Sequence, residues 1–331
     1  MRALRGLPEL ERTTGGVPPP SGRRHTRWNR ALVTGGAGFI GSHVVDRLLA
    51  SGHRVVVLDD LSTGLASNVP PSTGLEVIDL AEPAAEHLVA RLKPDVVIHC
   101  AAQTSVQASF RDPTRDARSN VIASLNVIRG ALSAGTQRFV YITTGGALYG
   151  HPVSLPCSED HPIEPLSPYG WSKYIVERYL DILAGRQMSW VALRLANVYG
   201  PRQRADGEAG VVARFAAAMA QGQPVVIDGD GEQTRDFVFV SDVAAAVAAA
   251  LGSDLAGPVN IGTGVGTSVN QLFALLASIA GYSQAPVHGP ARPGDIRQSV
   301  LSQDRASRSL GWAAQTGLEE ALKPTYLGMS A

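Results

Sequence analysis

The sequence predicts an α/β protein with a doubly wound parallel sheet and a smaller C-terminal α+β lobe. Three observations predict this class. Short apolar runs alternate with helical stretches from Ala31 onward, a glycine-rich turn joins the first run to the first helix, and the alternation loosens after Pro201. Strands that are buried on both faces are continuous apolar runs, and their alternation with helices is typical of parallel sheets.

The elements of the predicted main sheet follow one another from residue 30 to residue 200. Gly52 ends the first helix, and a continuous apolar run then marks the second strand. Six runs are predicted to be strands: Ala31–Val33, Arg54–Leu58, Leu75–Ile78, Val96–His99, Phe139–Ile142 and Trp190–Leu193. Four stretches between them are predicted to be helices: His43–Ala50, Glu82–Leu92, Thr114–Ser133 and Tyr169–Leu183.

The segment 201–331 is predicted to be mostly a substrate-binding lobe that returns some strands to the main sheet. We expect helices at residues 211–221, 242–251 and 268–280, and strands near Val225–Ile227 and Phe237–Val240. The segment 1–29 is predicted to be a disordered basic arm, because residues 1–30 contain seven arginines, two acids and the consecutive prolines Pro18–Pro20. We interpret this arm as a non-functional extension.

Composition excludes several function classes for this chain of 331 residues. Its 29 basic and 29 acidic residues give a formal net charge of zero, which argues against a nucleic-acid binder. Apolar residues make up 44% of the chain, too many for a disordered protein, yet the longest apolar run is too short to span a membrane. Two cysteines and no Cys/His cluster predict neither a disulfide scaffold nor a metal site. We expect a cytoplasmic protein.

A glycine-rich turn between the first predicted strand and helix indicates a dinucleotide site. The segment reads TGGAGFIG, in which Gly35, Gly38 and Gly41 permit a tight turn and let backbone N–H groups approach a pyrophosphate. Asp59 ends the next strand, where a carboxylate accepts hydrogen bonds from the adenosine ribose and repels a 2′-phosphate. No arginine follows in residues 60–64, so this Rossmann-type sheet is predicted to bind NAD rather than NADP. The alternative is a structural turn with Asp59 as a helix cap.

An acid–base pair is predicted from Tyr169 and Lys173, which lie four residues apart and therefore on one face of a helix. A cation beside a phenol lowers the pKa of the phenol from about 10 and favours a phenolate that acts as a general base. Thr143 and Thr144 follow the fifth strand, at the edge where a doubly wound sheet places active-site groups. Taken alone, the tyrosine–lysine pair is typical of a solvated helix face. The two threonines, taken alone, are typical of residues that cap a turn.

Eight segments occur in an order that is typical of one known family: TGGAGFIG, DDLSTG, HCAAQTSV, TTGGALYG, YGWSK, LRLANVYGPRQ, GDGEQTRDFVFVSDV and RPGDIRQS. On these segments, residues 30–325 resemble the extended short-chain dehydrogenase/reductase family, specifically its NAD-dependent nucleotide-sugar epimerases and dehydratases. The resemblance implies that Thr144 hydrogen-bonds the reacting hydroxyl, that Tyr169 is the base, and that Lys173 orients the nicotinamide ribose. It also implies a homodimer formed through helices 114–133 and 169–184.

The resemblance assigns the remaining site residues to two groups. NAD would contact Gly35, Gly38, Phe39, Ile40, Gly41, Asp59, Asp60, Leu61, Ser62, Thr63, Gly64, Asp79, Leu80, Cys100, Ala101, Ala102, Gln103, Asn120, Thr143, Tyr169 and Lys173. The nucleotide-sugar substrate would contact Thr144, Asn197, Arg235, Arg292, Asp295 and Ser299. Arginine suits a diphosphate because its guanidinium forms bidentate hydrogen bonds. For Arg235 the alternative is a surface ion pair with Asp236 or Asp230, and for Asp79 a helix cap.

Two departures from the family pattern affect these assignments. The two residues before Asn197 are not aromatic, so the packing of the cofactor at that point is not carried over. The loop after the catalytic hydroxyl is one residue longer than usual. We place a glycine bulge at Gly145 and assign Thr144 as the hydroxyl, with Thr143 as the alternative.

The residues after Thr144 separate the reactions of the family. Dehydratases and decarboxylases carry an acid there, whereas Gly145, Gly146 and Ala147 cannot transfer a proton. The resemblance therefore implies an epimerase that inverts C4 of a UDP-hexose through a transient 4-keto sugar. The small Ser299 implies that the UDP-GlcNAc/UDP-GalNAc pair is accepted beside UDP-glucose/UDP-galactose.

Three alternatives stay open at this point. A related epimerase or reductase acting on UDP-glucuronate or a GDP-sugar shares nearly every motif. A dehydrogenase that releases its cofactor would accumulate reduced NAD(P)H. A non-catalytic NAD-binding regulator usually lacks the tyrosine–lysine pair, so Tyr169 and Lys173 count against it.

Overall fold

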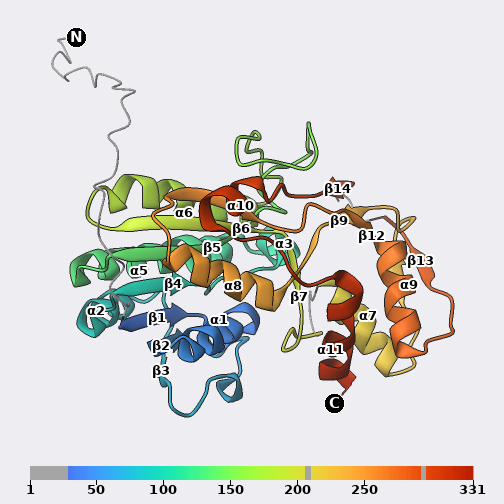
Figure 1. Ribbon diagram of the computed structural model, residues 1–331, viewed down its shortest axis with the longest axis horizontal. Helices are drawn as coiled ribbons and strands as arrows, with labels where there is room; N and C mark the ends of the chain where they lie inside the picture. Colours follow the sequence, from blue (N-terminus) through green and yellow to red (C-terminus); the bar gives the residue numbers. More distant parts are fainter. Residues whose placement is uncertain (1–28, 206–209, 292–295, 331) are drawn as a thin grey trace, which may run out of the picture.

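The computed structural model describes residues 29–205, 210–291 and 296–330, so nearly all of the predicted arm lies outside it. Its centre is a seven-stranded sheet in the order β11-β6-β5-β4-β1-β2-β3, with every neighbouring pair parallel (Figure 1). The doubly wound α/β class is confirmed. The strands are β1 (Arg30–Thr34), β2 (Arg54–Asp59), β3 (Gly74–Val77), β4 (Val96–His99), β5 (Arg138–Thr144), β6 (Ser189–Leu195) and β11 (Gly257–Ile261).

Helices cover both faces of this sheet because its strands are apolar on both faces. In β5, Val140 and Ile142 belong to one hydrophobic core, whereas Phe139 and Tyr141 belong to the other. The first core contains residues of α1 (Phe39–Ala50) and α8 (Val240–Leu251), and the second contains residues of α2 (Pro83–Leu92), α5 (Ala123–Ala134) and α6 (Pro168–Ala184).

The predicted continuous helix Thr114–Ser133 is wrong in one respect, because a π-helical turn interrupts it. The chain forms α4 (Pro113–Ala117), the π turn η2 (Arg118–Ile122) and then α5. Asn120 lies in this turn, and its amide bonds the backbone of Gln103 at 2.9 and 3.0 Å and Ser172 Oγ at 3.1 Å. A π turn is typical of functional sites, and here it aims a side chain at two neighbouring segments.

A smaller lobe lies beside the carboxyl end of the sheet (Figure 1). Three helices, α7 (Val211–Ala220), α9 (Val269–Ala280) and α11 (Leu318–Ser330), pack around their own core. Short strands complete the lobe: β7 (Asn197–Tyr199) with β10 (Phe237–Phe239), β8 (Val226–Asp228) with β13 (Val287–Gly289), and β9 (Thr234–Arg235) between β12 (Thr267–Ser268) and β14 (Gln298–Ser299). The strand that returns to the main sheet is β11. The remaining helical elements are α3 (Val106–Arg111), η1 (Ala66–Asn68) and α10 (Asp304–Leu310).

The parallel register brings the carboxyl ends of the strands to one edge. Thr34 pairs with Leu58 and His99, and Thr144 pairs with Leu195. His99 is fully buried and joins β1 to α5, because its ring nitrogens contact Thr34 Oγ1 at 2.6 Å and Ser124 Oγ at 2.8 Å. Active-site groups gather at such an edge in doubly wound folds.

Within the described residues, no helix is both long and apolar enough to cross a membrane. Nor does the same part of the chain bring three histidine, cysteine, aspartate or glutamate side chains together as metal ligands.

Candidate active site

The turn between β1 and α1 has a shape that requires glycine. Gly35 has a φ of +67°, and a β-carbon on it would lie 2.6 Å from the backbone nitrogen of Ala101. A β-carbon on Gly41 would collide with the carbonyl oxygen of Gly35. Gly38 is the N-cap of α1, and in the described chain no side chain caps this helix. The N–H groups of its first turn therefore suit the pyrophosphate of a dinucleotide.

A groove of about 1040 Å³ runs from this turn along the edge of the sheet. It is lined by thirteen of the residues that were assigned to NAD: Gly35, Gly38, Phe39, Asp59, Asp60, Ser62, Thr63, Asp79, Leu80, Cys100, Ala101, Ala102 and Gln103. The others lie outside this lining: Ile40, Gly41, Leu61, Gly64, Asn120, Thr143, Tyr169 and Lys173. Asn120 supports the groove from behind by binding the backbone of Gln103.

Two carboxylates stand at the adenosine end of the groove. Asp59 accepts hydrogen bonds from the N–H groups of Ala37 at 3.0 Å and Leu61 at 2.9 Å, and burial raises its pKa while these bonds oppose the rise. Asp79 forms an ion pair with Arg118 at 3.1 Å, and the N-cap of α2 is Glu82 rather than Asp79. Uncapped helix N–H groups, a glycine cradle and a carboxylate after β2 fit NAD.

A second cavity of about 770 Å³ adjoins this groove, since Thr104, Ser105 and Gly210 line both. Four residues assigned to catalysis or substrate line it: Thr144, Tyr169, Asn197 and Arg235. Ser299 is not part of this lining, but it lies next to Gly146, which is. A β-carbon on Gly146 would lie 3.7 Å from Asn197 Oδ1, 3.8 Å from Ser299 Oγ and 3.9 Å from Thr144 Oγ1. Arg292 and Asp295 lie outside the described residues.

The predicted catalytic trio is Thr144, Tyr169 and Lys173, of which the first two line the second cavity and Lys173 lines neither cavity. Ser167 begins α6 as its N-cap and accepts a hydrogen bond from the N–H of Gly170 at 3.1 Å. Tyr169, in the first turn, is hydrogen-bonded to Thr144, which ends β5. The Thr143 hydroxyl is buried and has no hydrogen-bond partner in the described structure. This geometry favours Thr144 over Thr143 as the reacting hydroxyl's partner.

The electrostatics of the trio correct one expectation. Burial raises the pKa of Tyr169 far above its usual value, and the Thr144 hydrogen bond offsets only part of the rise. Burial also lowers the pKa of Lys173 to about 8, against the opposing charges of Cys100, Glu177 and Asp116. The expected lowering of the Tyr169 pKa by Lys173 is therefore not found, because desolvation of the phenolate has the largest effect and Lys173 is not among the groups that shift this pKa.

Asp230 and Asp236, the two acids considered as partners of Arg235, both bind other groups. Asp230 binds Arg297 through two hydrogen bonds of 2.7 and 2.9 Å. Asp236 is buried and accepts hydrogen bonds from Thr263 and Leu301. Arg235 itself lines the second cavity.

Several lining residues of the second cavity were not found by sequence reasoning. They come from the smaller lobe and include Val211, Arg214, Phe215, Val226, Gln233 and Val269. The sequence could have indicated Arg214, because it is the only charged residue in the otherwise apolar helix VVARFAAAMA. It lies 3.7 Å from Asp228 and brings a second guanidinium to the cavity that holds Arg235.

Comparisons with known proteins agree with this geometry. The model of the NAD-dependent epimerase/dehydratase family matches residues 31–262. The UDP-glucose 4-epimerase of Mycolicibacterium smegmatis is 43% identical over 89% of this chain and 97% of its own length. Two solved UDP-glucose 4-epimerases are similar. That of Thermotoga maritima with UDP-glucose has 45% identity, a TM-score of 0.88 and coverage of 90% of this chain and 98% of its own. That of Thermus thermophilus with NAD has 41% identity, a TM-score of 0.86 and coverage of 91% and 98%.

The family match, the identity over nearly the whole length of these relatives and the glycine-cradled groove all point the same way. This chain belongs to the NAD-dependent epimerase/dehydratase family.

Proposed function

We propose that this protein is an NAD-dependent UDP-hexose 4-epimerase that interconverts UDP-glucose and UDP-galactose. One observation carries the proposal: the hydrogen-bonded pair of Thr144 and Tyr169 lines the second cavity, which adjoins the dinucleotide groove. A sugar bound in the second cavity would place a hydroxyl beside this pair and next to the cofactor groove.

The side chains have separate roles in this reaction. Thr144 binds the C4 hydroxyl, Tyr169 removes its proton, and Lys173 orients the ribose of the cofactor. NAD bound in the groove would supply a reversible hydride acceptor for C4. Tyr169 holds the proton while the sugar is at the 4-keto level and returns it to the C4 oxygen, and the second cavity would have to let the keto sugar rotate so that its opposite face is reduced. Arg214 and Arg235 suit the diphosphate in the same cavity.

The loop after Thr144 favours epimerisation over dehydration. A β-carbon on Gly145 would lie 2.5 Å from a methyl carbon of Leu301, so this position holds no larger side chain without rearrangement. A side chain on Gly146 would point among Thr144, Asn197 and Ser299, where the sugar must lie. Neither position therefore offers an acid for the elimination of water.

Product analysis tests this function. Purified protein is incubated without added NAD with UDP-glucose, UDP-GlcNAc or UDP-glucuronate, and the sugar products are identified by nuclear magnetic resonance. We expect UDP-galactose from UDP-glucose with no net reduced cofactor. A 4-keto-6-deoxy sugar or steady accumulation of NADH would contradict the proposal.

The substrate range also follows from the second cavity. Ser299 is small and faces the space beside Gly146, which leaves room for a substituent larger than a hydroxyl at C2. The proposed range therefore includes UDP-GlcNAc and UDP-GalNAc. A Ser299→Tyr variant should lose activity on UDP-GlcNAc while retaining activity on UDP-glucose; equal kinetics of variant and wild type on UDP-GlcNAc would oppose this range.

We also propose a homodimer whose interface is formed by α6 and the adjacent turn η2. Trp171, Ile175, Tyr179 and Ile182 are exposed at a spacing of four, four and three residues, which places them along one side of α6. Ile122, in the adjacent turn η2, is exposed as well.

The cytoplasmic location of the protein stays a prediction.

A further inference from the structure

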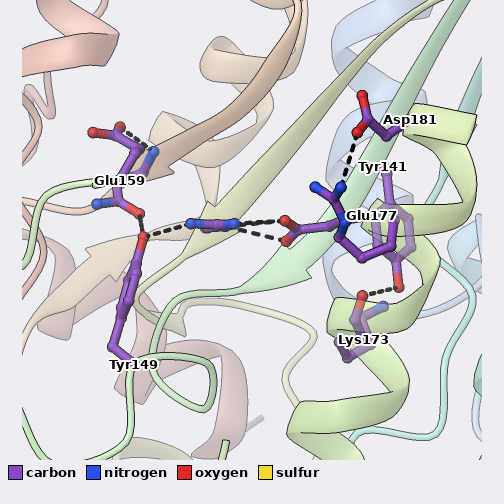
Figure 2. Close-up of polar contacts among 9 residues, drawn as sticks. Tyr141, Tyr149, Glu159, Lys173, Glu177 and Asp181 are labelled. Carbon is purple, nitrogen blue, oxygen red and sulfur yellow. Dashed lines mark hydrogen bonds and ion pairs between the residues drawn. The ribbon is translucent and has the colours of Figure 1, made fainter. Parts of the chain in front are cut away.

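A buried polar cluster lies beside α6, the helix that carries Tyr169 and Lys173 and is called the catalytic helix below. None of the members of this cluster lines either cavity. It consists of Glu177 on α6, Arg194 on β6, Tyr149 in the loop after β5, and Asn260 on β11 (Figure 2). The side chains of Arg194 and Glu177 are only 4% and 3% exposed. We call these four residues the Arg194 clamp.

The guanidinium of Arg194 contacts two separate parts of the molecule. Its Nε donates to the Glu177 carboxylate at 3.1 and 3.2 Å, and its Nη2 donates to Glu177 Oε2 at 2.6 Å. Its Nη1 donates to the Tyr149 hydroxyl at 3.1 Å, which in turn donates to Asn260 Oδ1 at 2.6 Å. A bidentate contact fixes both distance and orientation, which a single point charge does not.

The clamp joins the two parts that carry the reacting groups. Glu177 lies four residues after Lys173 and eight after Tyr169, so all three share one face of α6. Tyr149 lies in the loop that begins directly after Thr144. Arg194 is on the neighbouring strand, where its backbone pairs with Thr143. One guanidinium therefore contacts both the helix that carries Tyr169 and the loop that follows Thr144.

The free-energy cost of burying charges indicates that stability alone does not explain this cluster. Removing two charges from water costs free energy that their attraction often fails to repay, and apolar side chains of similar volume are frequently as stabilising. What a hydrogen-bonded ion pair adds is a defined geometry. Misplacing a reacting group by about 1 Å can slow a reaction on the order of 10²-fold.

We propose that Arg194 is a positioning residue for C4 epimerisation, which holds the catalytic helix and the Thr144 loop at a fixed separation through Glu177 and Tyr149. This inference rests on the proposed function, because turnover at C4 is one of its readouts.

Three variants on the same scaffold test the proposal. Tyr149→Phe removes the hydrogen bonds of the Tyr149 hydroxyl to Arg194 and Asn260 and keeps the ion pair with Glu177, whereas Arg194→Lys keeps the charge but loses the two-sided contact. Arg178→Lys is the matched control, because Arg178 forms an exposed ion pair with Asp181 on the same helix at 3.1 Å (Figure 2). The measurements are kcat per bound NAD, KM for UDP-glucose, and the isotope effect of deuterium at C4.

We expect kcat to fall about tenfold in Tyr149→Phe and about 100-fold in Arg194→Lys, with KM and bound NAD changed less than about twofold. The deuterium isotope effect on kcat should rise, because the chemical step becomes slower than product release. Arg178→Lys should match the wild type. Unchanged kcat per bound NAD with a lower melting temperature would overturn the proposal, since the clamp would then stabilise the fold alone.

A crystal structure of Tyr149→Phe gives a readout that does not depend on turnover. This variant keeps the ion pair, so it decides the question even if Arg194→Lys does not fold. We expect the Thr144 and Tyr169 hydroxyl oxygens to move beyond hydrogen-bond reach, and an unchanged contact would overturn the proposal. Failure of the wild type to epimerise UDP-glucose would instead refute the proposed function, while this distance would still test the clamp.

Discussion

At the scale of single residues, the hydrogen bond between Thr144 and Tyr169 explains how a tyrosine can act as a base in a dry site. Burial raises the pKa of Tyr169, and the Thr144 hydroxyl opposes that rise. A neutral phenol cannot accept a proton, so Tyr169 has to be a phenolate when it takes the proton of the sugar hydroxyl. Burial disfavours that phenolate, and the hydrogen bond from Thr144 favours it.

Removal of the phenol hydroxyl tests the base directly. We expect Tyr169→Phe to lower kcat by at least about 10²-fold, because general-base catalysis contributes on that order. KM for UDP-glucose should change little. Tyr174→Phe, one turn further along the same helix, serves as the control and should retain full turnover. Wild-type turnover of Tyr169→Phe would remove this residue from the reaction.

The two adjacent threonines are expected to behave differently. Thr144→Val loses the hydrogen bond to Tyr169 and the contact to the reacting hydroxyl, so turnover should fall at least about tenfold. Thr143→Val replaces a buried hydroxyl that has no partner among the described residues, so stability should be kept or increased. Steady-state kinetics and thermal unfolding of the two variants distinguish them. The reverse pattern would reassign the catalytic hydroxyl to Thr143.

At the scale of elements, the sequence was most informative where burial alone decides structure. Strand β4 has the predicted bounds because all four of its residues are buried in the sheet. The turn η2 was missed because it depends on the contacts of Asn120 with Gln103 and Ser172, which lie far away in the sequence. Strand β11 was missed because it begins with Gly-Pro and contains the polar Asn260, whose side chain bonds Tyr149 and the backbone of Cys157, both distant in the sequence.

The same distinction holds within the candidate site. The glycine turn, Asp59 and the tyrosine–lysine pair occupy spacings that the chemistry itself demands, so their place could be predicted. Arg194 and Glu177 could not be predicted, because charged residues are rarely buried and nothing local pairs them. Arg214 reaches the cavity only through the packing of the smaller lobe.

The link that His99 makes between β1 and α5 should render the fold sensitive to acid. Burial lowers the pKa of His99 from 6.5 to about 3, so below pH 6.5 the unfolded chain binds a proton that the folded chain does not. Stability from this group is complete above pH 6.5 and is lost as pH falls toward 3. At pH 5 the loss should be about 2 kcal/mol, at 1.36 kcal/mol per pKa unit.

Urea unfolding at pH 7 and pH 5, with saturating NAD, measures this loss. Other groups titrate over the same range, so the comparison is with His99→Gln, which keeps a donor and an acceptor but cannot be protonated. We expect the free energy of unfolding to fall by about 2 kcal/mol more in the wild type than in the variant. An identical pH dependence of the two proteins would show that His99 is not the acid-sensitive group.

At the scale of the whole molecule, residues of the sheet edge and residues of the smaller lobe together form the site. The sheet edge provides the cofactor groove and the trio, and α7, β8 and β9 provide the far wall of the second cavity. Strand β11 and helix α8 follow lobe segments in the sequence yet pack in the main sheet and its core. The chain thus crosses between the two parts repeatedly, and residues of both parts line the second cavity.

The proposed dimer is a property at this scale and has a simple test. Ile182 is the most exposed of the apolar side chains along α6, at 71%. We expect Ile182→Glu to convert a dimer into a monomer in light scattering, because a charge buried in an apolar interface is costly. Glu319→Gln, on the distant helix α11, is the control and should stay dimeric. A wild-type protein that is monomeric at micromolar concentration would contradict the proposal.

In the proposed reaction, one site removes a hydride from C4 of UDP-glucose and returns it to the same carbon. The most direct measurement follows deuterium at C4 of UDP-glucose during conversion without added NAD. We expect UDP-galactose that retains the deuterium at C4, with none exchanged into solvent. Loss of deuterium to water, or its appearance in released NADH, would contradict the account.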